Sequence, residues 1–249
     1  MIAGLELSVL MLSAVALFAA AFVRGYSGFG FTAMAVVTLS IIIPPSTIVP
    51  VILLIEIVAG MSLLPSVWQR VDWRQLRWIL FGAVLATPVG VMMLSELSGQ
   101  VMRVVISSVI LMAACAIWLG FRARKGESAT SIVSAGVVSG AMNGASGVGG
   151  LPLVVFFLSR DENPGTARAT LICFLIVLDI YTCSLATLEG LITSEVLQLA
   201  VLFLIPVTLG TMLGNQQFLR SPQKSFRRVA LVMLMLISGG GLTRALISL

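Results

Sequence analysis

Two short glycine-rich stretches carry the groups best suited to bind an anion. They read "RGYSGFGF" at residues 24–31 and "NGASGVGG" at residues 143–150. Glycine permits positive φ and a close approach of backbone N–H groups, while serine, the Asn143 amide and the Arg24 guanidinium donate hydrogen bonds. A short helix that begins directly after each stretch would point its positive N-terminal end at the break. The predicted substrate-binding residues are Arg24, Gly25, Ser27, Gly28, Gly30, Asn143, Gly144, Ser146, Gly147, Gly149 and Gly150.

The two stretches are related by a fixed offset. Gly25 and Gly144 lie 119 positions apart, and the same offset places Ser27 on Ser146. Small residues three or four positions apart also occur wherever membrane helices pack closely. Two copies at one offset, each followed by a truncated apolar segment, instead favour the broken helices that form transport sites.

Four charged residues lie inside or at the edge of apolar segments. Glu56 and Asp179 are candidates for proton coupling or for pairing with Arg24, and the alternative is a structural hydrogen bond from a protonated acid. Arg24 is either buried beside an anionic partner or extended to the membrane surface. We expect Arg168 to mark the membrane surface, with a gating position in a cytoplasmic vestibule as the alternative. Glu56, Asp179 and Arg168 are therefore the candidates for coupling or gating.

These residues belong to a chain that is too apolar for a soluble protein. Hydrophobic residues make up 59% of the 249 positions and charged residues 10%, with a mean hydropathy of +1.11. The composition predicts an all-α integral membrane protein. Its second and seventh apolar segments are too short to span a bilayer core. The predicted segments are 5–23, 31–43, 47–66, 76–95, 101–121, 131–147, 150–159, 166–188, 193–215 and 225–247.

Basic residues predict the orientation of these segments. The positive-inside rule places the loops after the third, fifth and ninth segments in the cytoplasm. The acidic turn at Glu189 and Glu195 then lies outside, as do both termini, in a multi-pass inner-membrane protein. Each half is predicted to contain a broken hairpin, made of a full and a short helix, followed by three transmembrane helices. The halves form inverted repeats over residues 1–121 and 131–249, joined by a cytoplasmic linker at 122–130.

Composition also argues against several functional classes. The chain has no histidine, the usual metal ligand and general base, and it contains neither HExxH nor GxSxG. We therefore expect no enzyme activity, no metal and no cofactor, and the three cysteines predict no disulfide. Ten of the fifteen basic residues lie in the three basic loops, so the net charge of +5 is a topology signal and predicts no nucleic-acid partner. Membrane lipid and a small anion are the expected partners, and a homodimer is left open.

The paired glycine motifs resemble those of the TauE/SafE family of sulfite-exporter-like permeases. The resemblance extends over the whole chain, through its size, number of segments, twin motifs, basic central loop and a short Pro-x-Thr entry into the span after each motif. It implies a secondary transporter that exports sulfite or organosulfonates such as sulfoacetate across the cytoplasmic membrane by alternating access. The two motifs differ in that Arg24 and Phe31 of the first correspond to Asn143 and Gly150 of the second.

Two other functional classes stay open. The first is a proton- or cation-coupled carrier of another small solute, with Glu56 and Asp179 as the coupling residues. The positive charge of Arg24 argues against a cationic substrate for such a carrier. The second is a membrane scaffold or the subunit of an enzyme, which would support no flux of any anion.

Overall fold

The computed structural model describes residues 7–27, 30–40, 42–102, 104–106, 108, 129–160 and 162–220. Over these residues the regular structure is helical throughout, as predicted for an all-α protein. The labelled elements are α1 (Leu7–Ser27), α2 (Phe31–Leu39), α3 (Pro45–Val67), the short 3-10 helix η1 (Trp68–Arg70), α4 (Trp73–Glu96), α6 (Ala129–Ser146), α7 (Gly150–Ser159), α8 (Pro164–Leu188) and α9 (Ser194–Arg220).

The observed helices follow the predicted apolar segments, including both short ones. Among the described residues, four helices are long and apolar enough to span a membrane: α3 with η1, α4, α8 and α9. Together with a shorter apolar helix within α1, they make the chain a multi-pass membrane protein. The predicted segment at 101–121 lies largely outside the described residues, and the one at 225–247 lies entirely outside them.

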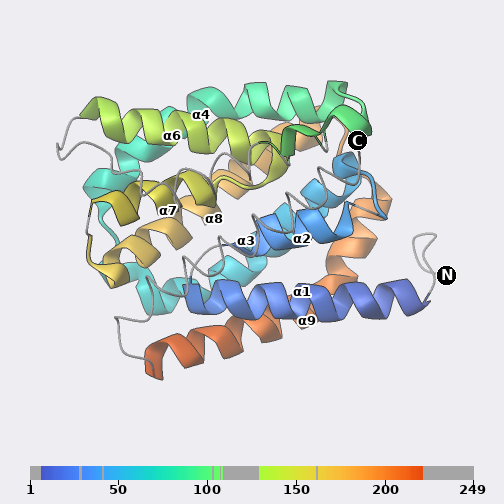
Figure 1. The fold of residues 1–249 in the computed structure, drawn as a ribbon, viewed down its shortest axis with the longest axis horizontal. Coiled ribbons are helices and arrows are strands. Elements are labelled where there is room, and N and C mark those ends of the chain that lie inside the picture. Colours follow the sequence, from blue (N-terminus) through green and yellow to red (C-terminus); the bar gives the residue numbers. More distant parts are fainter. Residues whose placement is uncertain are drawn as a thin grey trace.

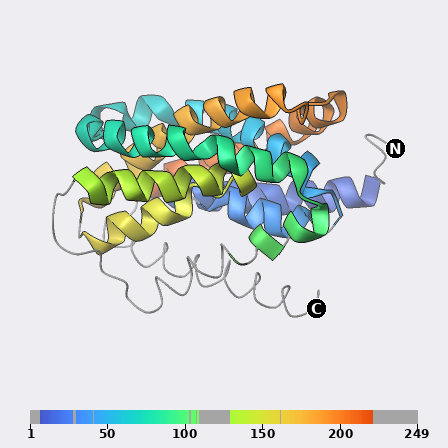
Figure 2. The same cartoon turned by 90° about the horizontal axis from the view of Figure 1, so that it is seen from above.

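Helices α3 and α8 form the centre of the protein. In their most apolar windows 61% of the residues are buried, against 39% for α4 and α9. The two central helices pack against each other, and α3 also packs against α9 while α8 packs against α4. The most extensive contacts join α1 to α9 and α6 to α4. Figure 2 shows that the helices lie roughly along one common direction.

Two helical hairpins enter this bundle from opposite ends. In Figure 1, α1 begins at the end marked N and is followed by α2, which turns back toward that end. The hairpin formed by α6 and α7 starts and finishes at the other end of the molecule. Both breaks therefore lie within the body of the protein, where the sequence predicted them.

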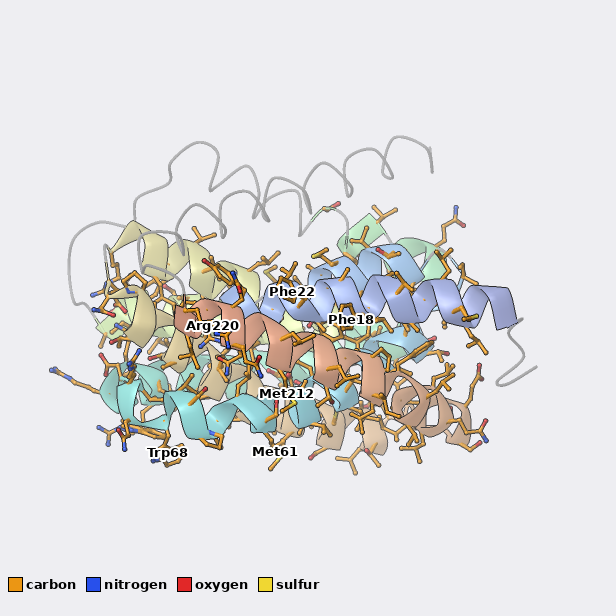
Figure 3. All side chains as sticks on the ribbon, turned by 90° about the horizontal axis from the view of Figure 1, so that it is seen from below. Phe18, Phe22, Met61, Trp68, Met212 and Arg220 are labelled. Carbon is orange, nitrogen blue, oxygen red and sulfur yellow. The ribbon has the colours of Figure 1, made fainter. Side chains whose placement is uncertain are left out.

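The arginine-containing turn after α3 and the acidic turn after α8 lie at opposite ends of the bundle. The basic turn between α3 and α4 and the C-terminal end of α9 share one end, where Figure 3 shows Trp68 and Arg220. The acidic turn after α8 lies at the opposite end, where the Ser95 hydroxyl donates a hydrogen bond of 3.3 Å to Glu189 Oε2. The grouping of basic and acidic turns agrees with the predicted topology, and which end faces the cytoplasm stays a prediction.

Large apolar side chains cover the outside of the bundle. Met61, Trp68 and Met212 are about half exposed, and Figure 3 shows them along the surface of the molecule. An exposed apolar surface of this extent is unfavourable in water and favourable against lipid tails. The surface of the helices therefore fits a bilayer.

Candidate functional site

Glycines in unusual backbone conformations form both helix breaks. Gly30 caps the N-terminus of α2 with a φ of 92°, and Gly147 follows α6 with a φ of 71°. Side chains other than glycine are strained at such positive φ values. The breaks therefore depend on these two glycines, while Gly28 of the first motif lies outside the described residues.

The two breaks face each other across a small cavity. An added Cβ at Gly147 would lie only 2.7 Å from Thr32 Cγ2, so the second break touches the first turn of α2. The cavity has a volume of about 10 Å³, which is room for one water molecule. The residues that line it come from both motifs and from the central helices: Gly30, Thr32, Ala33, Glu56, Gly147, Val148, Gly150, Leu151 and Leu175.

Arg24 forms a buried ion pair with Glu56. Its side chain is fully buried, Nε lies 3.0 Å from Glu56 Oε1, and Nη1 donates to the Glu56 carbonyl at 3.3 Å. The Thr32 hydroxyl donates to the other carboxylate oxygen, Oε2. Of the two alternatives left open for Arg24, the buried one is therefore present, and Glu56 supplies the anionic partner that a buried guanidinium requires. Pairing, the alternative that the sequence left open for Glu56, is the arrangement present.

Asn143 occupies the corresponding place in the second motif. Its Nδ2 donates to Asp179 Oδ1 at 3.0 Å and to Thr182 Oγ1 at 3.1 Å, and its Oδ1 accepts from the Gly149 N–H at 3.1 Å. One amide thus connects the end of α6, the start of α7 and the middle of α8. The two motifs use the same plan with different chemistry, since each contacts an acid of a central helix.

The difference in chemistry makes the centre electrostatically asymmetric. Glu56 has a cationic partner, whereas Asp179 is held by the neutral Asn143. Asp179 is fully buried, its Oδ2 accepts no hydrogen bond from the described residues, and it lies within electrostatic range of both Glu56 and Arg24. A buried carboxyl group in this position is expensive to ionise without a cation.

Other predicted site residues have structural partners of their own. Ser146 donates to the Met142 carbonyl of its own helix at 2.8 Å. An added Cβ would lie 2.1 Å from the Thr211 carbonyl oxygen at Gly25 and 2.4 Å from the Thr87 carbonyl oxygen at Gly144. These two glycines therefore allow close packing of helices, which was the alternative considered from the sequence. The side chain of Ser27 lies outside the described residues.

Arg168 is buried and does not mark the membrane surface as expected. Its exposed fraction is 2%, and Nη2 donates to the Gly25 carbonyl and, at 3.0 Å, to Asn215 Oδ1. The guanidinium also stacks 4.1 Å from the centre of the Phe218 ring. Because the Gly25 carbonyl belongs to the last turn of α1, Arg168 donates to a backbone acceptor at the C-terminal end of that helix.

The sequence did not identify three residues of this network. Thr32 follows the first motif inside an apolar segment, and Thr182 lies three positions after Asp179, on the same face of its helix. Asn215 directly follows a glycine in the ninth segment. An isolated polar residue within an apolar helix was the available signal, but the sequence alone does not give the partner.

Comparison with known proteins gives a result consistent with this architecture. The family model described as "Sulfite exporter TauE/SafE" matches residues 12–240, nearly the whole chain. Neither the curated proteins nor the solved structures contain a significant match.

Proposed function

Because the chain belongs to the sulfite exporter TauE/SafE family, we propose that it exports small sulfur oxyanions across the cytoplasmic membrane. The substrates are sulfite or an organosulfonate such as sulfoacetate. The observation that carries the proposal is the buried Arg24–Glu56 pair at the cavity between the two helix breaks. A cation held at the meeting point of two helix N-termini is suited to an anion.

The Glu56 carboxylate occupies the position on Arg24 that the transported anion takes in this proposal. A carboxylate and a sulfonate both offer several acceptor oxygens, and the guanidinium fork binds either. Arg24 and Thr32 donate to the Glu56 carboxylate in the closed arrangement, and the same donors are available to a substrate that displaces it. Ser27, Ser146, Asn143 and the glycine backbone of both motifs complete the proposed site after the bundle opens.

In many transporters, alternating access comes from the movement of one structural repeat against the other. The helix contacts support inverted repeats. If α1 corresponds to α6, α3 to α8 and α4 to α9, then the α1–α9 contact corresponds to the α6–α4 contact, and the α3–α9 contact to the α8–α4 contact. The cavity of about 10 Å³ is too small for a sulfonate, so the arrangement corresponds to a closed state. Opening toward either side of the membrane would come from relative movement of the two halves.

The membrane potential supplies a driving force in the proposed direction. A potential that is negative inside favours the outward movement of each negative charge by about 2.3 kcal/mol per 100 mV. Arg24 carries the positive charge that an anion needs when it leaves water for the membrane interior. Export of a sulfur oxyanion can therefore proceed without a coupled cation.

Flux into proteoliposomes tests the proposal. The wild type is expected to transport sulfite or sulfoacetate, and the double variant Arg24→Gln/Glu56→Gln is expected to fold and to lose this flux. The double substitution removes both charges of the pair, so neither is left buried alone. Arg77→Gln is the matched control, because Arg77 is exposed and its Nε donates to the Trp73 carbonyl of its own helix.

The single variant Glu56→Gln tests whether Glu56 competes with the substrate. Without the carboxylate, Arg24 is free to bind an anion, so added sulfite should raise the melting temperature more than it does for the wild type.

The flux experiment has two outcomes that contradict the proposals. Unchanged flux in the double variant would reject the proposed site. If the wild type transports no sulfur oxyanion, the proposed function is wrong.

A proton- or cation-coupled carrier is the second candidate function. Asp179 favours it, because this buried acid has no direct cationic partner among the described residues and lies near Glu56. In such a carrier, transport by Asp179→Asn or Glu56→Gln should lose its dependence on a pH gradient. If both variants retain that dependence, neither acid carries the coupled proton.

A further inference from the structure

A second, larger cavity opens at the basic end of the bundle. Its volume is about 310 Å³, within the range of small-molecule sites. It is lined by the start of α4, the start of α6 and residues between α7 and α8. The lining residues are Asp72, Arg74, Gln75, Trp78, Ala129, Ile132, Arg160 and Glu162. We call this cavity the vestibule.

The acidic groups of the vestibule already have partners. Asp72 Oδ1 caps α4 by accepting from the Gln75 N–H at 3.0 Å. Glu162 Oε1 accepts from Gln75 Nε2 at 2.7 Å and lies 4.0 Å from Arg160 Nε. Each carboxylate uses one oxygen in these contacts, which connect it to the wall of the cavity.

Other polar groups of the vestibule lack hydrogen-bond partners among the described residues. Arg160 Nη1 is buried and has no hydrogen-bond partner among the described residues, although the guanidinium stacks 4.9 Å from the Phe156 ring centre. No hydrogen bond or ion pair joins Arg74 to another described residue. Gln75 is 8% exposed, and its Oε1 lacks a donor within the same part of the chain. Arg160 Nη1, the Arg74 guanidinium and one amide oxygen are therefore available to a ligand.

Helix α7 connects the vestibule to the central break. Gly150, its first residue, lines the central cavity, and Arg160 follows its last residue in the vestibule wall. The helix has ten residues, which corresponds to a length of about 15 Å. A ligand in the vestibule would thus lie about one short helix away from the Arg24–Glu56 pair.

We propose that the vestibule binds an oxyanion, a sulfonate, sulfite or phosphate group, through Arg74 and Arg160. Guanidinium groups match the geometry of such oxygens, and Gln75 Oε1 accepts from a hydroxyl of the ligand or from a protonated oxygen. The group is supplied either by a free substrate anion or by an anionic lipid headgroup at the membrane surface. Only the first source rests on the proposed transport function.

Equilibrium binding to the full-length protein tests this site. The double variant Arg24→Gln/Glu56→Gln removes the charged pair of the central site, so remaining anion binding that depends on Arg74 and Arg160 reports the vestibule. In this background we titrate sulfite, sulfoacetate and inorganic phosphate, and add Arg160→Gln or Arg74→Gln. Each addition should weaken binding about tenfold, the usual effect of losing one charged hydrogen bond. Arg74 is exposed, so its replacement leaves the fold intact, and Arg77→Gln is the control.

A lipid arm distinguishes the two sources. The same variants are placed in nanodiscs of phosphatidylglycerol or phosphatidylcholine, and the lipid retained on purification is measured. Free-anion binding that depends on Arg160 and Arg74 supports the site as a substrate vestibule. Retention of phosphatidylglycerol that depends on both arginines, without binding of a free anion, supports it as a headgroup site. If neither ligand responds to either arginine, the proposal is wrong, whether or not the wild type transports a sulfur oxyanion.

Discussion

Arg24 and Asn143 show how one position in a repeated motif can serve two chemistries. Both side chains reach an acid on a central helix, Glu56 in one half and Asp179 in the other. The arginine neutralises its acid, whereas the asparagine only donates a hydrogen bond. Sequence divergence between the motifs therefore concentrates positive charge on one side of the centre.

Thermal stability should show the cost of removing one member of the buried Arg24–Glu56 pair. Glu56→Gln leaves the Arg24 guanidinium buried without a counter-charge, and breaking such a pair costs about 3–5 kcal/mol. Adding Arg24→Gln removes the unpaired charge, so the double variant should unfold at a higher temperature than Glu56→Gln alone. Thermal unfolding in one detergent, without added anions, measures both. Equal melting temperatures would mean that Arg24 finds another partner or solvent.

Glu162 should make stability depend on pH. Burial raises the pKa of this carboxyl group above its ordinary value of 4.5; the hydrogen bond from Gln75 and the charge of Arg160 lower the pKa, and the charge of Asp72 raises it. The folded protein therefore binds the Glu162 proton more tightly than the unfolded chain does. This stabilisation is complete below the unfolded pKa and is lost as the pH rises through the raised folded pKa.

Glu162→Gln is the control for that pH effect, because it resembles the protonated acid at every pH. Melting temperatures of the wild type and the variant are compared as the pH increases from below 4.5. The wild type should lose stability relative to the variant over that range. Parallel curves would show that Glu162 titrates equally in the folded and unfolded states.

The sequence predicted the charged residues of the site better than their contacts. Glu56 and Asp179 were recognisable because a carboxylate in an apolar segment is expensive unless it is paired. The depth of Arg24 and Arg168 was not predictable, since a long basic side chain is compatible with both a surface and a buried position. Only tertiary packing determines that Arg168 turns inward toward the Gly25 carbonyl.

At the scale of helices, glycines determine how closely neighbours approach. Gly25 on α1 packs against Thr211 on α9, and Gly144 on α6 packs against Thr87 on α4. In both places the nearest atom is a backbone carbonyl oxygen, which cannot rotate away as a side chain would. The contacts are therefore rigid connections between helices far apart in the sequence.

Substituting these glycines should separate the helix pairs. Gly25→Ala and Gly144→Ala place a methyl group 2.1 Å and 2.4 Å from those oxygens, and overpacking of this kind costs about 1–3 kcal/mol or more. Gly99→Ala is the control, because among the described residues its added Cβ would meet only Pro45 Cδ, at 3.7 Å. Thermal unfolding should show a large loss for the first two variants and little change for the third. A small effect at all three positions would contradict this close packing of the helices.

Helix boundaries were predictable because apolar segments end at glycine, proline or charged residues. The positions of both breaks followed from two identical glycine spacings and the short segments after them. Which helices pack together was not predictable, since an apolar segment carries little information about its neighbour within a membrane. The pairing of α1 with α9, from opposite halves of the chain, therefore required the structure.

For the molecule as a whole, the position of the arginine-containing turns predicts its orientation. Gln69 lies in the basic turn after α3 and Glu195 at the acidic start of α9, and both side chains are exposed. In a protein whose native cysteines are replaced by serine, Gln69→Cys should react with a membrane-impermeant thiol reagent only from the cytoplasmic side. Glu195→Cys should react only from outside. Labelling of both from one side would contradict the predicted topology.

The contact between α1 and α9 also has a consequence for biosynthesis. Helix α1 is complete at residue 27, whereas its main neighbour begins only at residue 194. At about 5–20 residues per second, the ribosome needs on the order of ten seconds to make the intervening chain. During that time the packing surface of α1 around Gly25 faces lipid or the insertion machinery. The nascent chain must therefore remain in the bilayer partly assembled until nearly the last helix arrives.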